Sequence, residues 1–311
     1  MSKPFLNIMI YFSILLFLVS LIILVKGADV LVDSASGIAR TLGVSEFIIG
    51  ATIIAVGTSL PELSAAIFAS LMNAGGIAAG NVIGSNITNI LLVIGACAAV
   101  MPLLTKWEAK RVDVYIMLVM SFLVALFALD GTFSRIDGLV LLVCLVGILI
   151  ARKRRGVIEK GHRYAGAREV ALIIIGIAAV IIGAKFFVVG AKDIATFMGV
   201  SDYAIGLTAV ALGTSLPELT TALTAVRKKK PDMAVGNIVG SNIFNIAIVL
   251  GVATLIREIA VPSNILLFHI PIMIGAALVL TFYIKKGKIP AGLGVVFLLA
   301  YIAFIGASVF V

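Results

Sequence analysis

One heptapeptide, GTSLPEL, occurs twice in this chain, at residues 57–63 and at residues 213–219. A second block follows each copy at the same distance, as GNVIGSN from Gly80 and as GNIVGSN from Gly236. Both pairs of blocks are therefore related by one shift of 156 positions. A gap-free internal repeat of this length indicates a duplication, so the chain is predicted to contain two similar halves.

The repeats lie in a chain that is 62% hydrophobic and only 13% charged. A run of about 20 apolar residues is long enough to cross a bilayer as a helix. Ten such runs are predicted, at residues 8–27, 46–71, 78–100, 112–130, 136–152, 170–196, 203–227, 233–256, 264–285 and 290–311. We therefore predict an all-α integral membrane protein with ten transmembrane helices, the first of which can continue as a helix to about residue 40.

The longest hydrophilic stretch, residues 151–169, lies between the fifth and sixth apolar runs. It divides the chain into a first five-helix repeat at residues 1–150, a short basic cytoplasmic linker at 151–169, and a second five-helix repeat at 170–311. Five is an odd number, so the second half enters the membrane from the opposite face. The duplication is thus predicted to form two inverted-topology repeats.

Most of the 24 Lys and Arg residues fall in connections that share one side of this topology. The larger basic clusters are at residues 106–111, 152–168, 227–230 and 285–288. Because short cytoplasmic connections are enriched in Lys and Arg, both termini are predicted to be extracellular in a multi-pass protein of the plasma membrane. The net charge of +9 is explained by this topology, and no nucleic-acid partner is expected.

Each GTSLPEL copy carries one glutamate inside an apolar run. Glu62 lies sixteen residues after Glu46, which is about 24 Å along a helix and near the middle of the bilayer. Glu218 lies sixteen residues after Asp202 and reaches a similar depth from the other side. The two carboxylates are therefore predicted to meet near the midplane.

A charged residue within the hydrocarbon costs at least about 2.5–3.5 kcal/mol on insertion scales, so an intramembrane carboxylate indicates a functional site. A structural alternative is that each glutamate is neutral or is paired with Lys26 or Lys185. Neither lysine recurs at the matching position of the other half. A symmetric pair of salt bridges is therefore disfavoured.

A proline stands one residue before each glutamate, where it removes a backbone donor and breaks the helix. The break frees carbonyls around Thr58, Ser59, Thr214 and Ser215, which is tolerable at this depth only where the backbone lines a polar cavity or is buried in protein. Carbonyl, hydroxyl and carboxylate groups are all oxygen ligands. This set favours a hard cation such as Ca²⁺ or Na⁺ over zinc or copper.

The second blocks add polar side chains to otherwise apolar runs. Ser85 and Asn89 recur as Ser241 and Asn245, and we expect all four to line the ion site. Glycine pairs four residues apart, such as Gly236 and Gly240, are typical of closely packed membrane helices.

These motifs, GTSLPEL with GNVIGSN duplicated in two halves of five apolar runs, resemble the sodium/calcium exchanger family of the cation/Ca²⁺ exchanger superfamily over nearly the whole chain. The resemblance implies a fold in which the second, third, seventh and eighth helices form the ion-binding core. It also implies that the first and sixth helices slide past that core.

The same resemblance implies the ligands of each ion. Ca²⁺ is expected at Glu62 and Glu218 with the backbone carbonyls of Thr58 and Thr214. Na⁺ is expected at sites shared by Ala55, Thr58, Glu62, Ser85, Ala211, Thr214, Glu218 and Ser241. Ser59, Ser215, Asn89 and Asn245 are expected to line the same site.

Within the family that this chain resembles, some archaeal members and the potassium-dependent members carry an aspartate where this chain has Asn245. With asparagine there, the site holds at most two negative charges, which one Ca²⁺ balances and three Na⁺ exceed by one. Potassium co-transport is therefore not expected.

The sequence thus predicts a secondary active antiporter that exchanges Na⁺ for Ca²⁺ by alternating access, with one shared site. Ca²⁺/H⁺ exchange stays open as an alternative, because buried carboxylates can titrate, and a passive cation channel is a second alternative. No enzyme is expected, since no nucleophile and base occur at usable spacing. Ca²⁺ and Na⁺ are the expected substrates, and membrane lipid surrounds the protein. No cofactor and no obligate protein partner are indicated.

Overall fold

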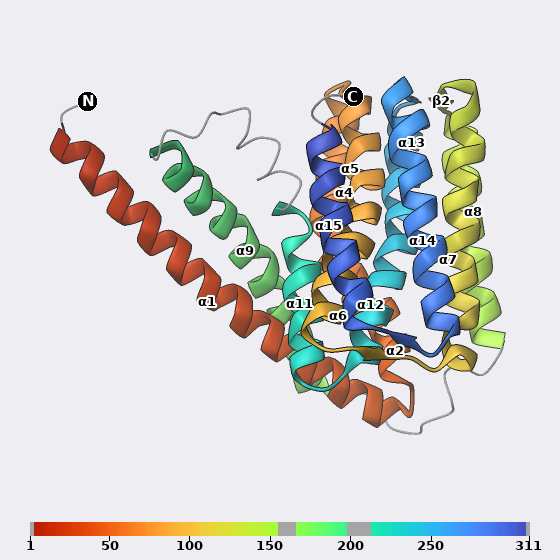
Figure 1. Cartoon of the computed structure of the whole chain (residues 1–311), viewed down its shortest axis with the longest axis horizontal. Helices are drawn as coiled ribbons and strands as arrows, with labels where there is room; N and C mark the ends of the chain where they lie inside the picture. The colour runs from red at the N-terminus through yellow and green to blue at the C-terminus, as the bar shows by residue number, and fades with distance from the viewer. Residues whose placement is uncertain (1–2, 155–165, 198–212, 309–311) are drawn as a thin grey trace.

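The computed structural model describes residues 3–154, 166–197 and 213–308, and it is almost entirely helical (Figure 1). Within these residues, seven helices are long and apolar enough to cross a membrane. Residues 46–58 and 60–71 form an eighth span that is bent by 42°. The prediction of an all-helical integral membrane protein is therefore confirmed.

The first half begins with one long helix, and two strands of two residues each precede its last two long helices. Its elements are α1 (Lys3–Leu42), α2 (Glu46–Ile49), the π-helix η1 (Gly50–Ile54), α3 (Ala55–Thr58), α4 (Leu60–Leu71), α5 (Gly75–Thr88), the π-helix η2 (Asn89–Ile94), α6 (Gly95–Val100), β1 (Leu103–Leu104), α7 (Trp107–Phe127), η3 (Ala128–Asp130), β2 (Thr132–Phe133) and α8 (Arg135–Arg154).

The second half repeats this order where it is described, except that a π-helix precedes α14 and no 3-10 helix follows it. They are α9 (Ala167–Phe197), α11 (Leu216–Arg227), α12 (Pro231–Phe244), the π-helix η4 (Asn245–Leu250), α13 (Gly251–Ile256), β3 (Ile259–Ala260), the π-helix η5 (Ile265–His269), α14 (Ile270–Lys285), β4 (Lys288–Ile289) and α15 (Ala291–Ser308).

Most predicted spans agree with these elements, but three of them need comment. The first span is longer than residues 8–27, because one unbroken helix continues to Leu42 as the sequence allowed. The seventh predicted span, 203–227, lies partly outside the described residues, and only α11 represents it. The fifth corresponds to α8, a helix of 20 residues.

The shift of 156 positions that relates the sequence blocks also relates the structure. The bounds of α4, α5, η2 and α6 become those of α11, α12, η4 and α13 when it is added. Unusual backbone conformations follow the same rule: Asn73 and Lys229 have φ of 60° and 59°, and Gly131 and Gly287 have φ of 83° and 82°.

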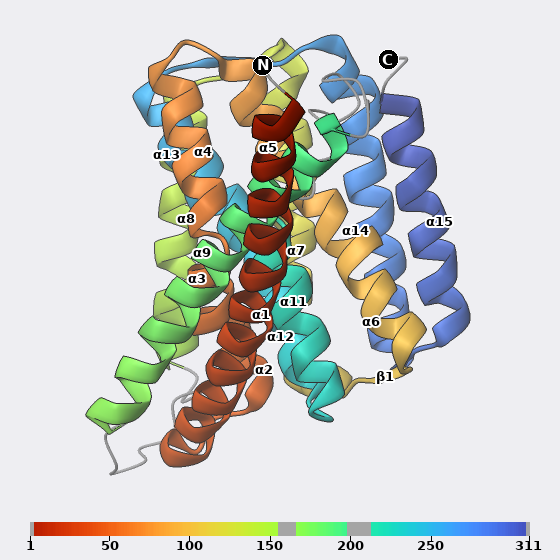
Figure 2. The same ribbon diagram turned by 90° about the vertical axis from the view of Figure 1, so that its left-hand side faces the viewer.

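The two short ladders connect one half of the chain with the other. Strand β1 pairs with β4, with Leu103 opposite Ile289, and β2 pairs with β3, with Phe133 opposite Ile259. Leu103 is related to Ile259, and Phe133 to Ile289, by the same shift of 156 positions, so the two registers are equivalent. Figures 1 and 2 place β2 and β1 at opposite ends of the bundle.

Helices α1 and α9 lie side by side and are inclined to the rest of the bundle (Figures 1 and 2). Glycines every seven residues along α9 allow this contact. A Cβ atom at Gly176 would lie 2.9 Å from the Leu31 backbone nitrogen, and one at Gly183 would lie 2.7 Å from that of Leu24. The two helices run antiparallel, because positions later in α9 meet positions earlier in α1.

Helix α12 occupies the centre, since every residue from Met233 to Phe244 is buried. A helix that is buried on all sides must be approached closely by its neighbours. A Cβ atom at Gly236 would collide with the Phe47 carbonyl, and one at Gly240 would lie 2.5 Å from the Ala51 carbonyl oxygen. The predicted close packing at this glycine pair is confirmed.

Two lysines just after α11 form ion pairs and hydrogen bonds with α1. The Lys228 ammonium lies 2.7 Å from Oδ2 of Asp33 and 3.3 Å from Oδ1 of Asp29. It also donates a hydrogen bond to the Asp29 carbonyl. Lys230 donates to the Ser36 hydroxyl.

Candidate ion-binding site

Two broken helices position the motif glutamates. Each break falls at the serine of the motif, with φ of −89° and ψ of 8° at Ser59 and φ of −89° and ψ of 0° at Ser215. The proline then lies in the first turn of α4 or α11, where its missing N–H leaves a carbonyl of the preceding segment without a helical donor. The predicted break is confirmed at Ser59, where the span from Glu46 to Leu71 bends by 42°. Most of the segment before Ser215 lies outside the described residues. Each glutamate follows in the first turn of α4 or α11.

The two glutamates are buried and face each other's half of the chain. Glu62 is 1% exposed and Glu218 is 0% exposed. The Ser59 hydroxyl of the first motif donates to Oε1 of Glu218 at 3.0 Å. Both carboxylates are thus buried inside the protein, and their meeting near the midplane of the bilayer stays a prediction.

Helices α5 and α12 supply the remaining polar groups. Asn89 donates to Oδ1 of Asn242 at 3.0 Å, which joins the two helices across the halves. Ser241 of α12 is fully buried. Ser85 and Asn245 are also buried, at 5% and 0% exposure. The four predicted lining residues therefore lie in the buried core of the same four-helix region.

A turn of π-helix begins at each lining asparagine, at Asn89 in η2 and at Asn245 in η4. The extra residue in such a turn shifts side chains around the helix axis, and π-turns are frequent at functional sites. Another π-turn, η1, ends just before Ala55. All of these turns lie in helices that carry predicted ion ligands.

Several oxygen atoms in this region are buried without a hydrogen-bond partner among the described residues. They are Oε2 of Glu62, Oε2 of Glu218, Oγ of Ser215, Oγ of Ser241, Oδ1 of Asn89 and Oδ1 of Asn245. Buried polar atoms are normally hydrogen-bonded, and an unpaired one requires an explanation such as an ion or water. A cation whose ligands are oxygen atoms satisfies this set chemically.

No lysine neutralises the glutamates within the part of the chain that the structure describes. None of the ion pairs between described residues includes Glu62 or Glu218. Lys26 and Lys185, the two partners considered from the sequence, have exposed side chains, whereas both glutamates are buried. The salt-bridge explanation is therefore wrong.

Two of the ligands implied by the family resemblance need separate mention. Ala55 is the first residue of α3 and is buried, and its carbonyl already accepts the Ser59 N–H at 3.1 Å. Ala211 lies outside the described residues.

Four further asparagines belong to the repeated second blocks, but none of them was predicted as a site residue: Asn81, Asn86, Asn237 and Asn242. Asn81 donates to the Glu62 backbone carbonyl at 3.0 Å. Asn237 accepts from the Thr58 hydroxyl at 3.4 Å, and Asn242 also donates to the Asn86 carbonyl at 3.3 Å. Their recurrence in both halves was the available signal. They support the backbone and side chains around the two glutamates.

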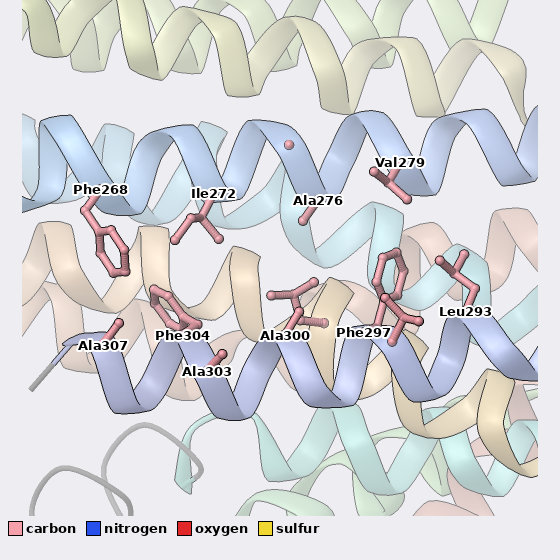
Figure 3. Close-up of a pocket in the computed structure, with 13 residues that line it drawn as sticks. Phe268, Ile272, Ala276, Val279, Leu293, Phe297, Ala300, Ala303, Phe304 and Ala307 are labelled. Carbon is pink, nitrogen blue, oxygen red and sulfur yellow. The ribbon is translucent and has the colours of Figure 1, made fainter.

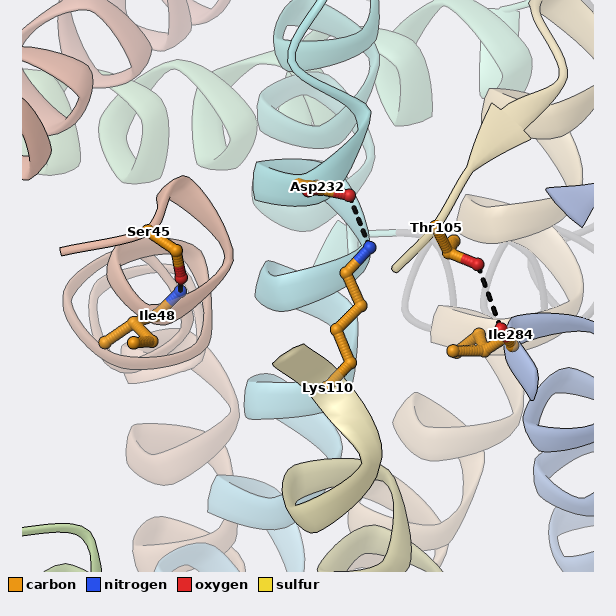
Figure 4. A network of polar contacts seen from close by, with 6 residues as sticks. All are labelled: Ser45, Ile48, Thr105, Lys110, Asp232 and Ile284. Carbon is orange, nitrogen blue, oxygen red and sulfur yellow. Dashed lines mark hydrogen bonds and ion pairs between the residues drawn. The ribbon is translucent and has the colours of Figure 1, made fainter. Parts of the chain in front are cut away.

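An ion pair at one end of the core was missed altogether (Figure 4). Lys110 of α7 has a fully buried side chain and pairs with Asp232 at the start of α12. Its ammonium also lies 5.6 Å from the centre of the Phe47 ring. Nearby, Ser45 caps α2 and Thr105 donates to the Ile284 carbonyl. The Lys110–Asp232 pair and the Lys110–Phe47 contact link α7 with α12 and α2 at this end of the core.

Comparison with known proteins gives consistent matches over the whole chain. A family model described as "Sodium/calcium exchanger protein" matches residues 12–153 and 168–310. The chain is 36% identical to sodium/calcium exchanger MaX1 of Methanosarcina acetivorans, over 96% of this chain and 98% of that protein. It is 39% identical to the uncharacterized membrane protein MJ0091 of Methanocaldococcus jannaschii, over 94% and 96%.

Among solved structures, the fold is similar to that of the sodium-calcium exchanger NCX_Mj soaked with 10 mM Na⁺ and 10 mM Sr²⁺. The TM-score is 0.86 at 38% sequence identity, and the match covers 96% of this chain and 98% of that one. These similar proteins with a named activity are exchangers rather than enzymes.

Proposed function

Because this chain belongs to the sodium/calcium exchanger protein family, we propose that it is a secondary active antiporter that exchanges Na⁺ for Ca²⁺ across the membrane. The observation that carries the proposal is the pair of buried glutamates, one from each half, with Ser59 of the first motif donating a hydrogen bond to Glu218 of the second. Without a compensating cation, two carboxylates at such a depth are costly. Binding of a cation substrate offsets that cost.

In this proposal the two substrates compete for one set of oxygens. Ca²⁺ binds Glu62 and Glu218 with the backbone carbonyls of Thr58 and Thr214. Na⁺ ions are shared among Ala55, Thr58, Glu62 and Ser85 and among Ala211, Thr214, Glu218 and Ser241. Ser59, Ser215, Asn89 and Asn245 line the site. Since the ions share ligands, they are not bound together, and this exclusion couples the two fluxes.

We propose that the chain crosses the membrane ten times, as two inverted repeats of five helices around this site. The repeated element bounds and the two ladder registers related by one shift support this arrangement. So does the position of β1 and β2 at opposite ends of the bundle (Figures 1 and 2). Inverted repeats around broken helices are typical of transporters that work by alternating access.

We propose an orientation with both termini outside the cell, in the plasma membrane. Helices α1 and α11 end at the end of the bundle that carries the β1–β4 ladder (Figure 2). Arg40, Arg227 and Lys288 therefore lie at one end, while α1 begins and α15 ends at the other. Short cytoplasmic connections are the ones enriched in basic residues.

The transport cycle is proposed to be electrogenic. With Asn245 neutral, the site carries at most two negative charges, from Glu62 and Glu218. One Ca²⁺ cancels them, whereas three Na⁺ leave one positive charge. Exchange of three Na⁺ for one Ca²⁺ then moves one net charge in each cycle.

Proton-coupled exchange and a passive channel are both less well supported. The named relative and the similar solved structure are sodium/calcium exchangers, so protons are not favoured as the coupling ion. A channel has no need of two broken helices in repeated halves, and its flux would not depend on an ion on the far side.

Uptake of radioactive Ca²⁺ into proteoliposomes preloaded with Na⁺ tests the proposal directly. Uptake is expected to require internal Na⁺, and replacement by internal K⁺ or by a proton gradient is expected to abolish it. Glu62→Gln and Glu218→Gln should each reduce uptake to the level of empty vesicles, because each removes an anionic ligand while keeping the shape of the side chain.

The matched control is Glu46→Gln, which changes a glutamate at the end of the same span, outside the site. It should keep most of the activity. Uptake driven by protons alone would reassign the coupling ion, and flux that persists in both site variants would refute the two-glutamate site.

A further inference from the structure

An apolar groove lies between α14 and α15, away from the ion site (Figure 3). It has a volume of about 500 Å³, and glycine, alanine, leucine, isoleucine, valine and phenylalanine residues line it throughout. Small residues on both helices leave this space open, among them Gly275, Ala276, Ala300 and Ala303. Phe268 and Phe304 stand at one end.

Three of the small residues that line the groove have larger counterparts in the first half of the chain. At the positions that match Gly275 and Ala276 in the first half, the chain has Val119 and Met120. The position that matches Ala300 is Cys144. The exchange is not uniform, because Phe297 and Phe304 match the smaller Leu141 and Ile148, and Ala303 matches Gly147.

The groove has the length of a lipid tail. From Leu293 to Ala307 it follows α15 for fourteen residues, or about 21 Å at 1.5 Å per residue. One leaflet of the hydrocarbon core is about 15 Å deep. The groove is therefore long enough to hold an acyl chain through the full thickness of one leaflet.

One end of the groove is basic. The helices run antiparallel, so the end marked by Val279 and Leu293 is the end where α14 stops and α15 begins (Figure 3). Lys285, Lys286 and Lys288 lie in that connection with exposed side chains. Among the described residues, none of the ion pairs includes them.

A cation–π contact directs one of these lysines back toward the groove. The Lys286 ammonium lies 4.5 Å from the centre of the Phe282 ring. Phe282 is three residues after Val279, and residues three apart are neighbours on a helix surface. The Lys286 charge is thus held on the helix face that carries Val279.

We propose that this groove binds an anionic phospholipid, with one acyl chain between α14 and α15 and the phosphate held by Lys286 and Lys288. The apolar walls supply dispersion contacts along the chain. A basic residue near a negatively charged headgroup contributes about a fivefold preference. Lys286 and Lys288 together therefore predict roughly a 25-fold preference for anionic over zwitterionic lipid.

Native mass spectrometry of the detergent-purified protein tests this, with phosphatidylglycerol or phosphatidylcholine added in equal amounts. The wild-type chain should retain about one phosphatidylglycerol and little phosphatidylcholine. The variant Gly275→Val with Ala276→Met fills the groove with the residues that the first half uses. It should lose the retained lipid, and so should the variant with Lys285, Lys286 and Lys288 all changed to Gln.

The matched control changes Arg152, Lys153 and Arg154 to Gln, which removes the same number of charges at the end of α8. It should retain the lipid. Ala303→Leu gives a second filled groove if the double variant unfolds.

Equal retention of both lipids, or retention unaffected by groove filling, would overturn the proposal. Loss in the control as well as in the lysine variant would show general attraction by surface charge and would also overturn it. These outcomes do not depend on transport activity.

Discussion

The Lys110–Asp232 ion pair has two members of very different exposure: the Lys110 side chain is fully buried, whereas 38% of the Asp232 side chain is exposed. Asp232→Asn leaves a buried ammonium without a partner, which is expected to lower the free energy of unfolding by about 3 kcal/mol. Lys110→Met leaves a carboxylate that can reach water, so its cost is expected to be below about 1 kcal/mol. Thermal unfolding in detergent measures both.

The double variant is the control for this prediction. With Lys110→Met and Asp232→Asn combined, no buried charge is left unpaired, and most of the stability should return. Equal losses in the two single variants would contradict the assignment of Lys110 as the buried member.

Asn245 offers a second prediction at the residue scale. Its side chain is fully buried, and both amide atoms lack a hydrogen-bond partner among the described residues. Asn245→Asp adds a third carboxylate to the site. Opposite charges about 4 Å apart attract by about 4 kcal/mol at an effective dielectric of 20, before desolvation is subtracted. The Na⁺ concentration for half-maximal exchange is therefore expected to fall by about tenfold.

The Na⁺ dependence of Ca²⁺ uptake measures this shift. Asn245→Ser, which removes the amide without adding charge, should not lower the half-maximal Na⁺ concentration. An unchanged value in Asn245→Asp would place this side chain outside the Na⁺ sites.

The sequence predicted residues of the site when chemistry and repetition agreed. Glu62 and Glu218 are costly in a membrane and occur at matching positions, so both signals indicated function. Lys110 gave the opposite signal: it resembled an ordinary basic residue at the end of a span, because its partner Asp232 is 122 positions away. An ion pair across such a separation is fixed by tertiary packing, which the spacing of residues does not contain.

At the scale of elements, apolar length predicted the spans that the described residues form, and proline predicted the helix break at Ser59. The π-turns η1, η2, η4 and η5 were not predicted, since one extra residue in a turn leaves the apolar character of a span unchanged. The β1–β4 and β2–β3 ladders were also missed, because strands of two residues carry no periodic pattern.

The contact between α1 and α9 supports a prediction for these elements. A Cβ atom at Gly183 would lie 2.7 Å from the Leu24 backbone nitrogen, and backbone cannot move aside as a flexible side chain can. Gly183→Ala should therefore separate the two helices and lower the unfolding midpoint. Alanine is otherwise the better helix former by about 1 kcal/mol.

Gly147→Ala in α8 is the matched control, since a Cβ atom there meets no described neighbour within 4 Å. It should leave the midpoint unchanged or raise it slightly. A drop of the same size in both variants would indicate that close packing of α1 on α9 is not the cause.

At the scale of the whole molecule, two similar halves meet at one site, and charge balance at that site predicts a response to voltage. Vesicles loaded with Na⁺ export three positive charges for the two that enter with each Ca²⁺. An inside-positive potential should therefore accelerate Ca²⁺ uptake, and an inside-negative one should slow it. One net charge per cycle corresponds to about 2.3 kcal/mol per 100 mV, so the limiting Ca²⁺ ratio should change about fiftyfold.

A potassium diffusion potential set with valinomycin provides the test, and radioactive Ca²⁺ accumulation provides the measurement. The same vesicles without an imposed potential are the control. Accumulation that ignores the potential would indicate that two Na⁺ exchange for each Ca²⁺. In that case both loaded forms of the site would be neutral, since two Na⁺ also balance Glu62 and Glu218, and the third Na⁺ would have no place among the ligands proposed here.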